Sequence, residues 1–289
     1  MNGFFYIDKQ SDWTSRDVCN KVQKIFNLPK VGHIGTLDPF ATGLLIVCVG
    51  SGTKAGTFFN DDEKEYIATL SLGKKTSTGD LTGEIVEEKE IVPFTKEDID
   101  NAFKALTGTI KQQIPMTSAV HVNGVKLYQY LHKGIEVDRP FREVEVKKLE
   151  FISSTNDSIT FKTVVSKGTY IRVLGEDIAS NINNVGHLTM LRRTRIGSAS
   201  ISMAKTLNEV KKEDFIPIRE LLKDIPQIVL CGDELNKAKH GMTIPFDING
   251  NNDKILVLDA DGNAIAMYHH DHQKYYKCLR GLSNAHRRI

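Results

Sequence analysis

A single carboxylate, Asp38, lies in a segment of small, apolar and rigid residues. Residues 32–43 read GHIGTLDPFATG, in which three glycines permit backbone conformations that other residues avoid and Pro39 fixes a turn. Such a loop can present one acid, with the imidazole of His33 nearby. The pattern also suits a turn in which Asp38 accepts backbone N–H bonds, as most Asp-Pro pairs do. Residue types alone therefore leave both roles open.

A second group of candidates is basic. Arg172 follows the sequence KGTYI, and its guanidinium could form two charge-assisted bonds that favour the ionised form of a carboxylate. Residues 187–205 contain no acid, and three arginines accumulate there: Arg192, Arg193 and Arg195. Such a cluster could bind phosphates, whose contacts supply most of the affinity for RNA, although most basic patches are solvated faces. Lys9 has the same two interpretations, a phosphate contact or a solvated side chain.

These side chains need rigid elements to position them. Residues 3–9 form an apolar run that predicts an opening strand, and Thr14 or Ser15 can cap the helix that follows. Residues 44–49 are continuously apolar, which indicates a strand covered on both faces directly after the Asp38 loop. Alternation in residues 64–73 places Tyr66 on the apolar face of the next strand. We expect further helices after Thr95 and from Ile171.

Three stretches resemble the TruB family of tRNA pseudouridine synthases. They are residues 32–43, the sequence KGTYIR ending at Arg172, and LRRTRIG in residues 191–197. Matches to the family run in its order from Asp8 to Gly197. Ile34 stands where the bacterial family usually has Thr, and residues 10–13 depart from its opening Asp-Lys-Pro-x-Gly-x-Thr-Ser.

The resemblance implies functional roles, which we state as expectations. Asp38 is the catalytic carboxylate, Tyr66 the aromatic platform for the target base, and Arg172 the cation that pairs with Asp38. His33 occupies the space that the flipped base leaves, and Tyr170 is either core or pocket wall. The expected substrate-binding residues are His33, Tyr170, Lys9, Leu191, Arg192, Arg193 and Arg195. The reaction converts uridine 55 in the T loop of tRNA to pseudouridine, with no cofactor and no metal.

The expected fold class is α+β, the pseudouridine synthase fold, with a central mixed or antiparallel sheet flanked by helices. Residues 1–225 would form the catalytic domain and residues 113–137 its RNA-clamping thumb. Around Pro226 the pattern changes to short apolar strands between Gly-, Asn- and Asp-rich turns, which predicts a small β domain over residues 226–289. Its place suggests the PUA-like RNA-binding domain of the family.

Composition limits the alternatives. The 289 residues are 40% hydrophobic and 26% charged, with a net charge of +2, as in an ordinary globular protein. Four cysteines lie far apart, which predicts neither a metal site nor a disulfide framework. No apolar run reaches the length of a membrane span, and the N-terminus lacks the features of a secretory signal. We expect a cytoplasmic monomer that acts on the T stem-loop of tRNA.

Two rival functions remain. One is a non-catalytic RNA-binding or RNA-folding protein on the same scaffold, although binding alone would not need Asp38, Tyr66 and Arg172 together. The other is a guide-RNA-dependent relative, which shares the Asp38 loop. Residues 114–137 favour the stand-alone kind, because the guided enzymes lack this thumb, so no guide RNA is expected.

Overall fold

The computed structural model describes residues 1–246 and 253–283. Within these residues, ten strands form one large mixed sheet, whose main path runs β14-β1-β3-β12-β4-β11-β10-β7. Almost all neighbours are antiparallel, and β12 pairs in parallel with β3. The fold is the mixed or antiparallel sheet flanked by helices that the sequence predicts. Its strands are β1 (Gly3–Lys9), β2 (Val31–Ile34), β3 (Thr42–Val49), β4 (Glu63–Leu72), β7 (Gly108–Gln113), β10 (Phe141–Ser154), β11 (Ser158–Ser166), β12 (Gly186–Ile196), β13 (Ala199–Ser200) and β14 (Ile216–Pro217).

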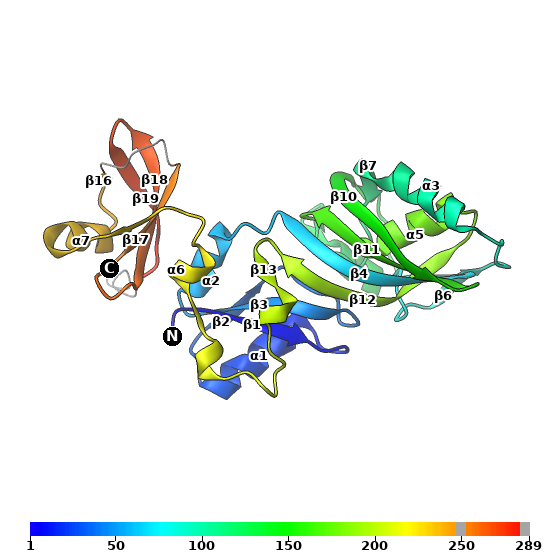
Figure 1. Cartoon of the computed structure of the whole chain (residues 1–289), viewed down its shortest axis with the longest axis horizontal. Helices are drawn as coiled ribbons and strands as arrows, with labels where there is room; N and C mark the ends of the chain where they lie inside the picture. The colour runs from blue at the N-terminus through cyan, green and yellow to red at the C-terminus, as the bar shows by residue number, and fades with distance from the viewer. Residues whose placement is uncertain (247–252, 284–289) are drawn as a thin grey trace.

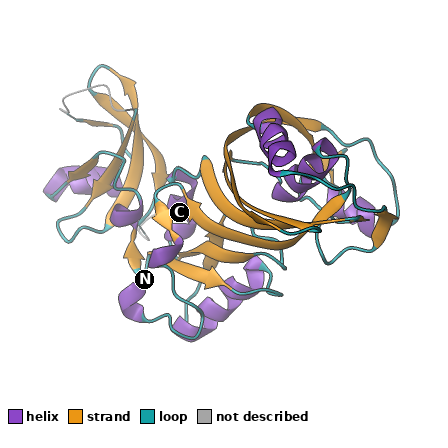
Figure 2. Cartoon of the chain, turned by 45° about the vertical axis from the view of Figure 1, so that its right-hand side comes forward, coloured by secondary structure: helices purple, strands orange, loops and turns teal. Residues whose placement is uncertain are grey.

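The helices cover this sheet because each has one apolar side. In α1 (Ser15–Phe26), Thr14 and Asp17 form a capping box, and the helix packs on β1 and β3. In α3 (Lys96–Leu106), Thr95 and Asp98 form the same motif. Figure 2 shows the half of the sheet that contains β4, β11, β10 and β7 curving around α3 and α5 (Ile171–Asn181). The buried residues of these two helices share one core with β4 and β11. Other short elements of this part include α2 (Gly52–Ala55), β5 (Lys74–Thr76), β6 (Ile85–Glu88) and α6 (Ile218–Leu221).

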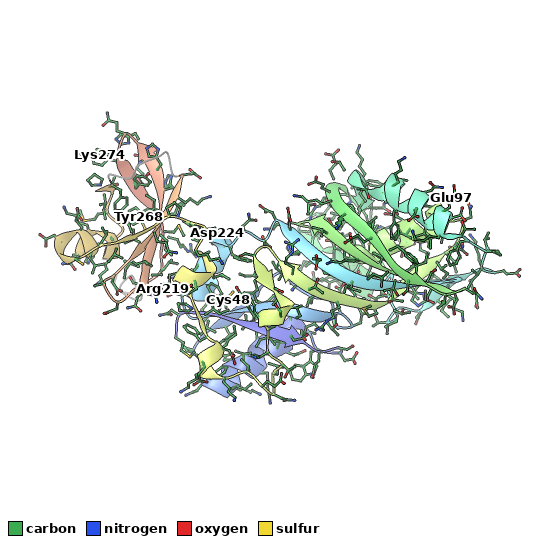
Figure 3. All side chains as sticks on the ribbon, in the orientation of Figure 1. Cys48, Glu97, Arg219, Asp224, Tyr268 and Lys274 are labelled. Carbon is green, nitrogen blue, oxygen red and sulfur yellow. The ribbon has the colours of Figure 1, made fainter. Side chains whose placement is uncertain are left out.

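A separate five-stranded sheet follows Pro226, in the order β15-β17-β18-β19-β16. Figure 1 shows it beside the large sheet, and Arg219 and Asp224, labelled in Figure 3, lie on the segment that leads to it. Its buried residues Leu256, Leu258 and Met267 join the core beneath β1 and β3. The division at residue 225 and the PUA-like character stay predictions, and part of the predicted range lies outside the described residues. The elements are β15 (Gln227–Val229), α7 (Gly232–Lys239), β16 (Ile244–Pro245), β17 (Lys254–Leu258), β18 (Ala264–His272) and β19 (Tyr275–Gly281).

The predicted thumb segment leaves the sheet after β7 and returns at β10. It contains the two-residue strands β8 (His121–Val122) and β9 (Val125–Lys126), followed by α4 (Leu127–His132). Leu127 is fully buried, and its N–H donates to the carbonyl of Val120 at 2.9 Å. The segment is therefore an ordered insertion between β7 and β10, stabilised by the burial of Leu127 and by this hydrogen bond.

Candidate active site

The Asp38 carboxylate faces the guanidinium of Arg172 through two contacts. Arg172 Nε lies 3.0 Å from Oδ2 of Asp38, and Arg172 Nη2 lies 3.3 Å from Oδ1. The arginine side chain is 6% exposed, whereas that of Asp38 is 37% exposed. This two-point pairing fixes the orientation of the carboxylate, while one side of it remains open to a ligand.

The other end of the Arg172 guanidinium is equally well held. Nη1 donates to the carbonyl of Thr78 at 2.7 Å and to the hydroxyl of Thr117 at 2.6 Å. The same nitrogen lies 3.5 Å from Oδ2 of Asp80, whose side chain is 5% exposed. Asp80 in turn accepts bonds from the hydroxyl of Thr78 and the N–H of Thr82. Arg172 thus contacts the carboxylates of Asp38 and Asp80, and it links the loops that carry Thr78 and Thr117.

Asp38 and Arg172 open onto a cavity of about 590 Å³. Tyr66, Tyr170 and Leu191 line it, together with Tyr128 from the predicted thumb. Tyr66 is 7% exposed, and burial raises the pKa of its hydroxyl despite the nearby Arg193 guanidinium. The backbone of Tyr170, directly before α5, is held by both ends of the buried Gln112 amide, at 3.0 and 3.2 Å. The cavity therefore combines the Asp38–Arg172 pair with aromatic walls, which suits a flat polar ring attached to a sugar. The charged residues Asp61, Lys64, Lys167 and Arg193 also line it.

Arg193 supports the loop that carries Asp38. Its side chain is fully buried on β12, and it donates to the carbonyls of Gly35 at 2.7 Å, Thr36 at 3.3 Å and Leu44 at 2.8 Å. Gly35 adopts a φ of 66°, a conformation that favours glycine and turns its carbonyl toward the guanidinium. Backbone carbonyls on both sides of the turn therefore accept the hydrogen bonds of the buried Arg193 guanidinium.

Comparisons with known proteins identify the family. Residues 23–171 match the family model described as "TruB family pseudouridylate synthase (N terminal domain)". The chain belongs to the TruB family. It is 39% identical over 275 residues to tRNA pseudouridine synthase B of Acholeplasma laidlawii, covering 95% of this chain and 98% of that one. It is 36% identical over 286 residues to the protein of the same name from Bacillus pumilus, covering 93% of each chain.

A solved structure supports the fold of this TruB-family chain. The structure of an H/ACA RNP bound to a substrate RNA containing 2′-deoxyuridine superposes with a TM-score of 0.71, over 98% of this chain and 86% of that chain. The sequence identity is 18%, so the likeness concerns the fold alone.

The predicted basic cluster does not form one surface in this TruB-family chain. Arg193 is buried and lines the cavity from β12. Arg192 pairs with Asp8 at 2.7 Å, with 37% of its side chain exposed, and Arg195 lies 3.6 Å from Glu63 with 30% exposed. Arg192 and Arg193 are neighbours on the strand and point to opposite faces, and a register shift lies between Arg193 and Arg195. Because Arg193 is buried, the three arginines do not share one exposed surface, and the contact of each with substrate stays a prediction.

Lys9 also differs from both of its predicted roles. It is fully buried, and its Nζ donates to the carbonyls of Gln10, Trp13 and Pro39 at 3.0, 2.7 and 2.9 Å. Burial lowers the pKa of Lys9 to about 8, against the opposing effect of the Asp38 charge. The side chain is neither solvated nor available to a phosphate, because it supports the turn that follows Asp38.

His33 lies on β2, beside the loop. Its Nδ1 is 3.6 Å from Sγ of Cys19, and its Nε2 is 3.2 Å from the hydroxyl of Thr36. Burial lowers the pKa of the imidazole, and the charges of Arg16 and Arg193 act in the same direction. His33 is not among the described cavity-lining residues, so its role in base flipping stays a prediction.

Two departures from the TruB pattern have structural explanations. Asp12 stands where the family's opening has glycine, and it has a φ of 65°, a conformation that aspartate tolerates better than most residues. Ile34 is a partly buried residue that packs against the core beneath β3.

Three supporting residues were missed from the sequence. Asp80 lies in residues 76–83, a loop that resembles the family's Thr-Asp-Thr-x-Asp-x-x-Gly, and this match was the available signal. Gln112 lies in no such match, and Thr117 lies in the thumb-like stretch without a role being implied for it. Their contacts to Tyr170 and Arg172 join segments 58 and 55 residues apart.

Across the described residues, no helix is long and apolar enough to cross a membrane, and no group of three potential metal-ligating side chains occurs.

Proposed function

We propose that this TruB-family chain converts uridine 55 in the T loop of tRNA to pseudouridine, as a monomer, in the cytoplasm and without a guide RNA. The observation that carries the proposal is the two-point pairing of Asp38 with Arg172 at the edge of the aromatic-walled cavity. The full-length relatives named tRNA pseudouridine synthase B support tRNA as the substrate.

In the proposed reaction, a uridine leaves the RNA stack and enters the cavity, because a stacked base cannot reach Asp38. Its N-glycosidic bond breaks, the base turns, and a bond forms between a ring carbon and the sugar. A proton leaves that carbon and the freed nitrogen gains one, so atoms and charge balance without a co-reactant. Asp38 either attacks the sugar or removes a proton, and both roles require the ionised carboxylate that Arg172 stabilises.

Tyr66 is proposed as the platform on which the uracil ring stacks. Its ring lies at the cavity wall on β4, a central strand, so the base would meet a rigid aromatic surface. A non-catalytic RNA-binding protein would have no use for a carboxylate in this place, since a negative charge repels phosphates.

The decisive experiment is Asp38→Asn, which keeps the size of the side chain and removes its charge. We expect pseudouridine formation to be abolished under single-turnover conditions, measured by mass spectrometry, while tRNA affinity in filter binding is retained. Asp157→Asn, in the exposed turn between β10 and β11, is the matched control. Product formation by folded Asp38→Asn protein, with deamidation excluded, would overturn the assignment.

A further inference from the structure

The thumb segment contacts the catalytic centre directly, through one hydroxyl. Thr117 lies in the turn that opens this segment, and its Oγ1 accepts a hydrogen bond of 2.6 Å from Nη1 of Arg172. We propose that Thr117 is a positioning residue, which holds the Arg172 guanidinium against Asp38. It thereby couples the position of the thumb to that of the carboxylate. The proposal rests on the proposed function and deepens it.

The geometry of the guanidinium explains why this hydroxyl matters. Nη1 carries two hydrogens, and its two short contacts are the carbonyl of Thr78 at 2.7 Å and Thr117 Oγ1. The third neighbour, Oδ2 of Asp80, is more distant at 3.5 Å. Without the Thr117 acceptor, one N–H of a nearly buried cation loses its partner, and the charge of Asp80 becomes the alternative. Because the guanidinium is planar and rigid, turning Nη1 toward Asp80 also moves Nε and Nη2 away from Asp38.

The turn that carries Thr117 is firmly placed. The N–H of Ser118 donates to the carbonyl of Pro115 at 3.0 Å, and the N–H of Tyr128 donates to the carbonyl of Ser118 at 3.1 Å. Ser118 is 4% exposed, and both Ser118 and Tyr128 line the cavity. A displacement of α4 is therefore transmitted to the Thr117 hydroxyl through backbone hydrogen bonds. In this arrangement, RNA binding to the thumb affects the position of Arg172, the partner of Asp38.

The test compares Thr117→Val, which removes the acceptor at nearly constant volume, with Thr117→Ser, which keeps it. We expect the single-turnover rate of pseudouridine formation to fall about tenfold in Thr117→Val, the loss typical of one hydrogen bond to a charged group. Thr117→Ser should stay within about threefold of wild type, and tRNA affinity should change by less than about twofold in both. Thr155→Val, which removes a hydroxyl from the exposed turn before β11, is the matched control and should retain the wild-type rate.

A double-mutant cycle distinguishes the proposed positioning role of Thr117 from a general structural role. In an Arg172→Lys background, Thr117→Val should cost less than about twofold, because the interaction that it removes no longer exists. Additive losses, or a Thr117→Val enzyme as fast as wild type, would overturn the proposal. If Thr117→Val does not fold, Thr117→Ala replaces it with the same expected loss.

An activity-independent readout separates this proposal from the proposed function. The Nε–H resonance of Arg172, assigned by its disappearance in Arg172→Lys, should shift in Thr117→Val and stay in place in Thr155→Val. Wild-type protein that is inactive on tRNA would refute the proposed function and leave this resonance as the test of the contact. Active wild-type protein with an unmoved resonance in Thr117→Val would refute only the positioning role.

Discussion

The Nζ of Lys9 lies 2.9 Å from the carbonyl oxygen of Pro39, the residue that follows Asp38. This contact joins the last residue of β1 to the turn that carries the acid. The same amine also bonds to the carbonyls of Gln10 and Trp13, so it brings together three backbone oxygens, and that of Pro39 also accepts from the N–H of Asp12 at 2.9 Å. Lys9 therefore contributes to the site through the backbone, not through a phosphate.

Lys9→Met should lower the free energy of unfolding by about 1–3 kcal/mol, because the carbonyls of Gln10 and Trp13 lose the amine as donor, whereas that of Pro39 keeps its bond from the N–H of Asp12. The salt dependence of tRNA affinity should be unchanged, since no phosphate contact is lost. Urea unfolding and filter binding at several salt concentrations measure the two quantities. Lys30→Met, at an exposed position, is the control. A flatter salt slope with unaltered stability would restore the phosphate role.

Arg172→Lys should reduce the single-turnover rate by about a hundredfold while tRNA affinity stays near that of wild type. A lysine keeps the charge, but one ammonium cannot reach both oxygens of Asp38 and also the Thr78 carbonyl. Arg219→Lys alters an exposed arginine paired with Glu220, away from the cavity, and should leave the rate unchanged. Equal rates for Arg172→Lys and wild type would show that charge alone suffices.

Tyr66→Phe and Tyr66→Leu should separate the ring from its hydroxyl. If the ring only stacks on the base, Phe retains activity and Leu loses it, because stacking on the base requires an aromatic face. If the hydroxyl also accepts the proton released from the base carbon, Phe binds tRNA normally and turns over slowly. Single-turnover rates and tRNA affinities of both variants distinguish the cases. Wild-type activity in both would exclude Tyr66 from the site.

Asp177→Asn should stabilise the protein at pH 7. Burial, with a contribution from Glu176, raises the pKa of Asp177 in α5 from 3.8 to about 6. The folded state then holds this proton more tightly than the unfolded state, so stability falls as pH rises from about 4 to 6. Asparagine avoids this cost, which we place at about 1–2 kcal/mol after solvent screening. Urea unfolding should show the gain at pH 7 and none below pH 4, and an equal gain at both pH values would contradict the assignment.

Local patterns predict most of the elements around the site. The opening strand, the capped helices α1 and α3, and the alternation that turns Tyr66 inward are confirmed, because each depends on neighbouring residues. Strand β12 was not predicted as a strand, since its arginines indicate a basic surface when only composition is considered. Its place between β3 and β4 depends on pairing with segments far away in the chain.

The pairing of Asp38 with Arg172 follows the family resemblance, and the contacts in the structure agree with it. The burial of Lys9 and Arg193 could not be predicted in the same way. The sequence does not show whether backbone carbonyls surround a basic side chain. In this protein they come from Pro39 for Lys9, and from Gly35 and Thr36 for Arg193. Supporting contacts of this kind depend on tertiary structure alone.

The parallel contact between β3 and β12 also has a consequence for the order of folding. Arg193 reaches the carbonyl of Leu44 across 149 residues of sequence, and it reaches that of Gly35 across 158. A ribosome therefore releases the Asp38 loop long before the arginine that supports it, and a nascent chain ending before β12 has the acid but not its anchor. Contacts so distant in sequence form slowly, so the site is completed only after about two thirds of these 289 residues have been made.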